Sequence, residues 1–158
     1  MTQLAESLLS EAHAGMPLPQ RVVSKFSPQE IRESIAALVK ADKLSLAHAL
    51  LDAGLSLYPS SEDMLVIGVL MAEMEGDWPR AKRLMHALMQ EQEPAVPEAS
   101  WQHWVRILRC NHEFSSALLA VRQALEKYPE SEALRAEHDA LSSLCETLPP
   151  AEPAAHNH

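Results

Sequence analysis

The apolar residues of the stretch 63–75, read DMLVIGVLMAEME, do not keep to one stripe of a helix. Ten of its thirteen positions are apolar or glycine. A helix on the surface of a globular domain shows one apolar face about 100° wide or more, with polar residues opposite it. Because this stretch is apolar on nearly every side, it must be covered from more than one direction. We therefore expect it to be the central helix of the chain.

The N-terminal residues 2–14 predict a short amphipathic helix, since apolar residues recur at helical spacing. The members of this stripe are Leu4, Leu8, Leu9 and Ala12. Gly15 is a plausible stop, and Pro17 and Pro19 disfavour resumption, so residues 16–26 are predicted to be an irregular connector. The stripe must be covered either by the body of the chain or by a second copy. The second alternative would give a homodimer through residues 2–14.

From residue 27 onward, the pattern predicts three helical hairpins and one final helix. The sequence Ser27-Pro28-Gln29-Glu30 is a strong start signal, because Ser27 and Glu30 can cap each other's backbone amides and Pro28 suits the first helical position. Ser60 or Ser61 can cap the second hairpin. The hairpins span residues 28–40 with 44–57, 63–75 with 78–91, and 98–110 with 114–128. The last helix, 131–146, has one polar side and can seal the end of the array.

The predicted fold class is therefore all-α, built from stacked antiparallel hairpins with an N-terminal helix and a C-terminal capping helix. Residues 1–26 form the N-terminal helix and connector, and residues 27–146 form the repeat domain. Residues 147–158 are rich in proline and alanine and are predicted to be a disordered tail.

Composition supports this class and excludes several functions. Apolar residues make up 47% of the 158 residues, and only four glycines occur. A net charge of −9 disfavours nucleic acid as a partner, because phosphate binding needs a basic surface.

No apolar run approaches the roughly 18 residues of a membrane span. The first residues lack the basic region of a secretory signal, and Cys110 and Cys145 stand alone, so we expect a cytoplasmic protein with reduced thiols.

Repeated residues mark a period close to 34. From Ala47 to Ala81 is 34 residues and from Ala81 to Ala117 is 36, while Tyr58-Pro59 recurs 70 residues later as Tyr128-Pro129. These offsets resemble the tetratricopeptide repeat, whose period is 34 and whose pattern is W-x2-L-G-x2-Y, A-x3-F and P. The third hairpin matches best, through Trp101, Trp104, Val105, Leu108, Ala117, Val121 and Pro129. The first hairpin matches through Ile31, Ser34, Ile35, Leu38, Ala47, Leu51 and Pro59, and the second through Leu65, Gly68, Val69, Ala72, Ala81 and Met85.

This sequence departs from the family pattern at the signature glycine, which is replaced by Ile35, Val69 and Val105. The signature tyrosine is also missing in each repeat. The resemblance covers residues 28–146. It implies a right-handed superhelix in which the first helices of successive hairpins line a concave groove for a partner segment.

The residues that match lining positions of that groove are the candidate partner-binding residues: Arg32, Val66, Ile67, Leu70, Met74, Gln102, Arg106 and Arg109. The middle group would form an apolar patch, and such patches mark interaction sites. Arginine suits carboxylates through its planar fork. Two alternatives stay open: residues 2–14 or the final helix cover the patch permanently, and the arginines belong to an ordinary solvated face.

The sequence contains no pattern typical of catalysis or metal binding. The eight histidines form no H-E-x-x-H or His-x3-His pair, and no phosphate-binding loop or nucleophile elbow is present. We therefore predict a protein that is not an enzyme and needs no cofactor or metal.

The predicted function is that of a small adaptor or chaperone that holds a protein or peptide with apolar anchors. In size, acidity and layout the chain is similar to the bacterial type III secretion chaperones that hold translocator proteins. The alternative is a structural subunit of a larger secretion or envelope assembly.

Overall fold

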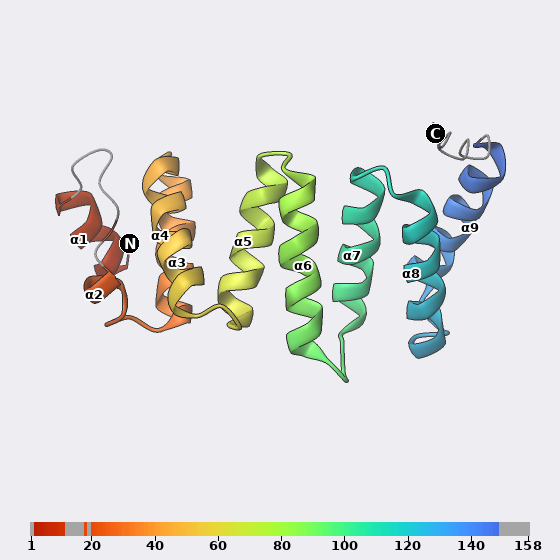
Figure 1. Cartoon of the computed structure of the whole chain (residues 1–158), viewed down its shortest axis with the longest axis horizontal. Helices are drawn as coiled ribbons and strands as arrows, with labels where there is room; N and C mark the ends of the chain where they lie inside the picture. Colours follow the sequence, from red (N-terminus) through yellow and green to blue (C-terminus); the bar gives the residue numbers. More distant parts are fainter. Residues whose placement is uncertain (1, 12–17, 19, 149–158) are drawn as a thin grey trace, which may run out of the picture. The chain divides into compact units, whose positions relative to one another are not determined.

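The computed structural model describes residues 2–11, 18 and 20–148. Within these ranges the chain forms nine helices and no strand (Figure 1). The prediction of an all-α fold is therefore confirmed. In the same ranges, no helix is both long and apolar enough to cross a lipid bilayer.

The chain divides into two compact units, Met1–Pro94 and Ala95–His158. Each is described by itself. The helices of the first unit are α1 (Gln3–Glu11), α2 (Gln20–Val23), α3 (Pro28–Lys40), α4 (Leu44–Leu57), α5 (Glu62–Met74) and α6 (Trp78–Gln92). Those of the second are α7 (Glu98–Cys110), α8 (Phe114–Lys127) and α9 (Glu132–Thr147). The predicted hairpin helices agree with these bounds to within one residue at each end.

The first unit is built from two helical hairpins laid side by side. Helix α3 pairs with α4 and α5 pairs with α6, while α5 also packs against both α3 and α4. Helix α1 packs on α3, and α2 packs on α4. The core that joins these helices consists of buried apolar residues: Leu4, Ala5, Leu8, Val23, Ile31, Ile35, Leu38, Ala47, Leu50, Leu51, Met64, Ile67 and Met71.

The N-terminal helix lies against the body of its own chain. Leu4, Ala5 and Leu8 are buried in the core, and the hydroxyls of Thr2 and Ser34 contact each other. The sequence left open whether the body of the chain or a second copy covers the apolar stripe of this helix. In residues 2–11, the body of the chain covers it. Residues 12–14 lie outside the described residues, and a homodimer through residues 2–14 stays a prediction.

The connector contains one element that the sequence did not predict. Residues 20–23 form the short helix α2, whose residue Val23 is fully buried. The expectation of an irregular segment is wrong here, because burial of Val23 stabilises a single helical turn too short to show periodicity. At the other end of the chain, α9 ends at Thr147. The predicted tail beyond residue 148 lies outside the described residues.

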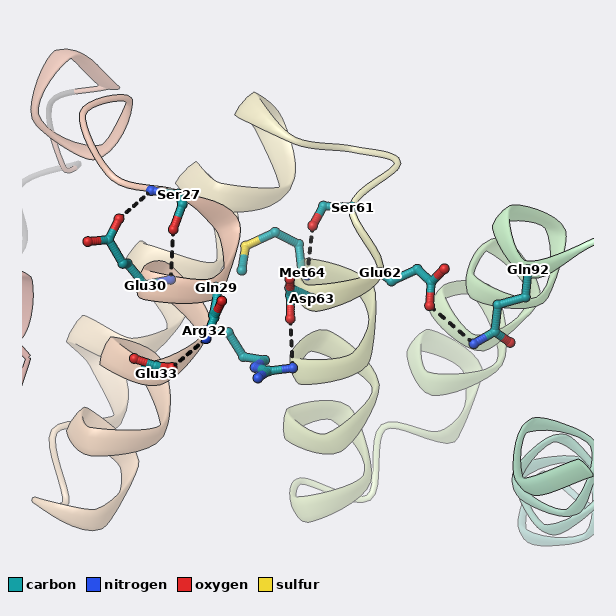
Figure 2. A network of polar contacts seen from close by, with 10 residues as sticks. All are labelled: Ser27, Gln29, Glu30, Arg32, Glu33, Ser61, Glu62, Asp63, Met64 and Gln92. Atoms are coloured by element: carbon teal, nitrogen blue, oxygen red, sulfur yellow. Dashed lines mark hydrogen bonds and ion pairs between the residues drawn. The ribbon is translucent and has the colours of Figure 1, made fainter. Parts of the chain in front are cut away.

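The predicted start of α3 is confirmed. Ser27 accepts a hydrogen bond from the Glu30 amide at 3.2 Å, and Glu30 accepts one from the Ser27 amide at 2.8 Å (Figure 2). The hydrogen bond that the Ser27 amide donates to the carboxylate, and after it the Ser27 hydroxyl, hold the pKa of the Glu30 carboxyl below its usual value. Ser61 caps α5 in the same way, accepting from the Met64 amide.

The turn between the two helices of each hairpin has the same geometry in all three. Its middle residue has a positive φ, 57° at Asp42, 71° at Gly76 and 60° at His112. In each case the next amide donates to a carbonyl five residues earlier, at 2.9 Å. This is the hydrogen bond of a Schellman ending, which satisfies a carbonyl at the helix end. The repeat seen in the sequence is therefore also a repeat of local structure.

A tyrosine closes the first and the third hairpins at their open ends. The Tyr58 hydroxyl donates to the Phe26 carbonyl at 3.0 Å, and the Tyr128 hydroxyl donates to the Val96 carbonyl at 2.7 Å. Both bonds join the end of a second helix to the segment just before the first helix. The recurrence of Tyr-Pro along the sequence thus has a structural reason.

The second unit consists of the α7–α8 hairpin with α9 packed against α8. Ser131 caps α9, and Leu134 and Leu141 turn inward and are buried. The remaining described positions of α9 are half-buried or exposed, as expected of a helix that seals one end of a helical array.

Candidate protein-interaction site

Helix α5 is covered on several sides, as its sequence predicts. It packs against α3, α4 and α6, and seven of its residues are buried. Gly68 allows close approach of α6, since a Cβ there would lie 3.0 Å from a methyl carbon of Leu84. What remains uncovered is one narrow side of the helix.

That side carries exposed apolar residues. Leu70 is 43% exposed and Met74 is 66% exposed, while Val66 is half-buried. These three residues are spaced four apart and therefore lie on one side of the helix. We call this surface the exposed α5 face. Leaving two large apolar side chains of one face in water is typical of an interaction surface rather than of a core.

Ile67 differs from the expectation. It is only 9% exposed and belongs to the core of the first unit. In a helix that is apolar on nearly every side, the sequence did not distinguish the positions that face neighbouring helices from those that face water. Ile67 therefore positions the exposed α5 face rather than forming part of it.

The N-terminal end of the exposed α5 face is bordered by a polar network (Figure 2). Arg32 on α3 reaches across to Asp63 on α5, with 2.6 Å between the guanidinium nitrogen and the carboxylate oxygen. The neighbouring Glu62 accepts a hydrogen bond from Gln92 of α6 at 3.4 Å. Arg32, a candidate partner contact, is thus already paired within the chain.

The other end of the face is acidic. Met74 is the last residue of α5 and stands between Glu73 and Glu75, and Glu75 contacts His48 of α4. Glu73 matches a lining position of the groove expected from the sequence, whereas Glu75 was not expected there. The lack of any lysine or arginine between residues 62 and 75 was a sequence signal for this acidic end.

The remaining three candidates lie on α7 in the second unit. Gln102 donates to Glu98 at 2.8 Å, and one Arg109 nitrogen donates to both carboxylate oxygens of Glu137 on α9, at 2.8 and 2.7 Å. Arg106 is exposed and makes no hydrogen bond or ion pair with residues that the structure describes. The structure brings these three residues together on one helix, and it brings Arg32 together with Val66, Leu70 and Met74 on two adjoining helices.

Helix α1 does not cover the exposed α5 face. It packs on α3, and Leu70 and Met74 are exposed. The described part of residues 2–14, residues 2–11, therefore does not fill this surface. Helix α9 belongs to the second unit, and the alternative in which it covers the face stays a prediction.

Within the described residues, no group of three or more histidine, cysteine, aspartate or glutamate side chains is arranged to hold a metal ion. Cys110 and Cys145 are both half-buried free thiols.

No protein-family model, curated protein or solved structure matches the chain in the comparisons made with each. The resemblance to tetratricopeptide repeats thus stays a prediction that rests on the residues quoted for it.

Proposed function

We propose that this chain is a protein–protein interaction module, a small adaptor or chaperone of the tetratricopeptide-repeat kind that holds a segment of a partner protein. The observation that carries the proposal is the exposed α5 face, where Leu70 and Met74 project from a helix that is otherwise covered. Burial of these side chains by a partner would supply the hydrophobic part of the binding free energy.

The physical character of the face suits a ligand of variable shape. Methionine is unbranched and polarisable, and it adapts to irregular apolar surfaces. The surrounding helices are held by a packed core, so the face is presented on a preformed support. In the second unit, Arg106 of α7 is exposed, and arginine suits a carboxylate through its planar fork.

The setting we propose is the cytoplasm, with a role such as that of the type III secretion chaperones whose layout the chain resembles. The free thiols of Cys110 and Cys145 support a reducing compartment.

The experiment is affinity purification with mass spectrometry from the native host, comparing the wild-type chain with Leu70→Asp. Leu119, 58% exposed on α8, provides a matched control as Leu119→Asp. The proposal predicts a partner retained by the wild type and by Leu119→Asp, and lost from Leu70→Asp. Retention of the partner by the wild type and by both variants would place binding elsewhere. A partner that never dissociates and copurifies at fixed stoichiometry would favour a structural subunit of a larger assembly.

A further inference from the structure

The second hairpin is closed at its open end by a different residue from the other two. In the first and third hairpins, a tyrosine hydroxyl at the end of the second helix donates to a backbone carbonyl before the first helix. The repeat offsets of 34 and 36 residues place Gln92 between Tyr58 and Tyr128 as their counterpart. The α5–α6 hairpin therefore has a glutamine where its neighbours have a tyrosine.

The side chain of Gln92 makes a weaker closure than either tyrosine. Its nitrogen donates to the Glu62 carboxylate at 3.4 Å, which is longer than most hydrogen bonds of this kind (Figure 2). The two tyrosine bonds measure 3.0 and 2.7 Å and end on backbone carbonyls. Glu62 is exposed, so water competes with Gln92 for the same carboxylate.

The amide oxygen of Gln92 opposes the closed state. It is buried and accepts no hydrogen bond from any residue that the structure describes. A buried acceptor left unpaired forfeits the hydrogen bonds that water would give it. Closing the second hairpin thus removes a polar atom from water without a partner, whereas the tyrosine hydroxyls of the other two hairpins are paired.

The backbone at the end of α6 is also held less well. At the ends of α4 and α8, the amides of Tyr58 and Tyr128 each donate to the carbonyl four residues earlier, at 2.8 Å. At the end of α6, the Glu93 amide donates to the Gln90 carbonyl, three residues earlier, at 3.3 Å. Such a tightened turn has poorer hydrogen-bond geometry than an α-helical turn. Side chain and backbone therefore weaken the same point of the fold.

We infer that the last turn of α6, residues 89–92, opens locally within the folded chain more readily than the last turns of α4 and α8, because Gln92 replaces the tyrosine that closes the other hairpins. Opening releases Glu62 and lets water reach the Gln92 oxygen. It also uncovers Met89, which is 9% exposed in the closed state, and the loss of this burial keeps the opened state a minor one. This conformational device goes beyond the proposed function and does not depend on it.

Native-state hydrogen exchange of the full chain, measured by NMR, tests the inference. Protection factors correct for the intrinsic exchange rate of each amide, so amides 89–92 can be compared with amides 54–57 of α4 and 124–127 of α8. Loss of one net hydrogen bond lowers protection about fivefold, and this is the difference expected. Equal or higher protection of amides 89–92 would overturn the inference.

Three variants test whether the tyrosine hydroxyl is the cause. Gln92→Tyr supplies the second hairpin with the hydroxyl that closes the other two, and it should raise the protection of amides 89–92 about fivefold. Gln92→Phe is the matched control, since it adds the same ring without the hydroxyl, and it should raise protection less. Tyr58→Gln makes the opposite change in the first hairpin and should lower the protection of amides 54–57 about fivefold.

Amides in the middle of α3 and α5 show whether each variant keeps its fold, because their protection should stay as in the wild type. Equal effects of Gln92→Tyr and Gln92→Phe would mean that the hydroxyl does not close the hairpin, and the inference would be overturned. Tyr58→Gln tests it independently of any change at position 92. If amides 54–57 keep the wild-type protection in Tyr58→Gln, the tyrosine does not control opening and the inference fails.

Discussion

The Arg32 guanidinium of α3 lies 2.6 Å from the Asp63 carboxylate of α5, and this ion pair joins the first helices of two successive hairpins. Asp63, Val66 and Leu70 lie on the same side of α5, since three and four residues separate them. The pair therefore marks the N-terminal border of the exposed α5 face. Arg32, expected from the sequence to contact a partner, is committed to a neighbour within the chain.

This ion pair should contribute little to stability. The side chains of Arg32 and Asp63 are 40% and 34% exposed, so water and salt screen their attraction. A double-mutant cycle with Arg32→Ala and Asp63→Ala, followed by urea unfolding, should give a coupling of about 0.2–1 kcal/mol that declines in high salt. A coupling of several kcal/mol would show that the pair holds the hairpins together.

Neighbouring residues of α5 should respond in opposite ways to truncation. Ile67→Ala should lower the free energy of unfolding by about 2–5 kcal/mol, because Ile67 is buried in the core. Met74→Ala should change it by less than about 1 kcal/mol, because Met74 is largely exposed. Urea unfolding of both variants measures this. Equal losses would mean that Met74 is covered in the folded chain.

A substitution at Gly76 measures the cost of a left-handed backbone conformation alone, because the new side chain would meet no clash. Its φ is 71°, and a Cβ placed there would meet no atom within 4 Å. Gly76→Ala should therefore destabilise the chain by about 1–2 kcal/mol, the cost of a left-handed conformation for an ordinary residue. Gly76→Asn should cost less, because asparagine tolerates this region. Thermal unfolding compares the two, and an equal cost for both would contradict the explanation.

The two tyrosine bonds should be of similar strength. Tyr58→Phe and Tyr128→Phe each remove a hydroxyl that donates to a backbone carbonyl. Each variant should lose about 0.5–1.5 kcal/mol of unfolding free energy. Hydrogen exchange localises the effect, which should appear in the first unit for Tyr58→Phe and in the second for Tyr128→Phe. If neither variant is destabilised, the two tyrosine hydrogen bonds contribute nothing to the free energy of unfolding.

The capping box at Ser27 and Glu30 predicts a pH dependence. Because folding lowers the pKa of Glu30, its contribution is fully present above the pKa of the unfolded chain and is lost as pH falls through the folded value. The difference in unfolding free energy between the wild type and Glu30→Ala should therefore be largest near neutral pH and shrink in acid. Glu126→Ala removes a carboxylate of α8 with no capping role and serves as the control. A difference independent of pH would show that the charge of Glu30 plays no part.

Features fixed by neighbouring residues could be predicted from the sequence. The start of α3, the hairpin helices and the turns depend on residues within one or two helical turns of each other, such as Ser27 with Glu30. The repeat offsets also predicted equivalent alanines, of which Ala47, Ala81 and Ala117 are all fully buried.

Features that depend on distant residues could not be predicted in the same way. The burial of Ile67 follows from how α3, α4 and α5 pack, and a pattern that is apolar on nearly all sides carries no information on that. The pairing of Arg32 and Arg109 depends on Asp63 and Glu137, about thirty residues away in each case. Helix α2 was missed because four residues are too few to show a period.

Site-specific photocrosslinking tests most directly the central claim that the exposed α5 face binds a partner. A photoreactive phenylalanine analogue is placed at position 74 or, as the control, at position 119, and cells of the native host are irradiated. Both positions are apolar and more than half exposed. The account predicts one adduct of defined mass from position 74 that is absent from position 119 and is lost when Leu70→Asp is added. The same adducts from both positions, or an adduct from position 119 alone, would contradict it.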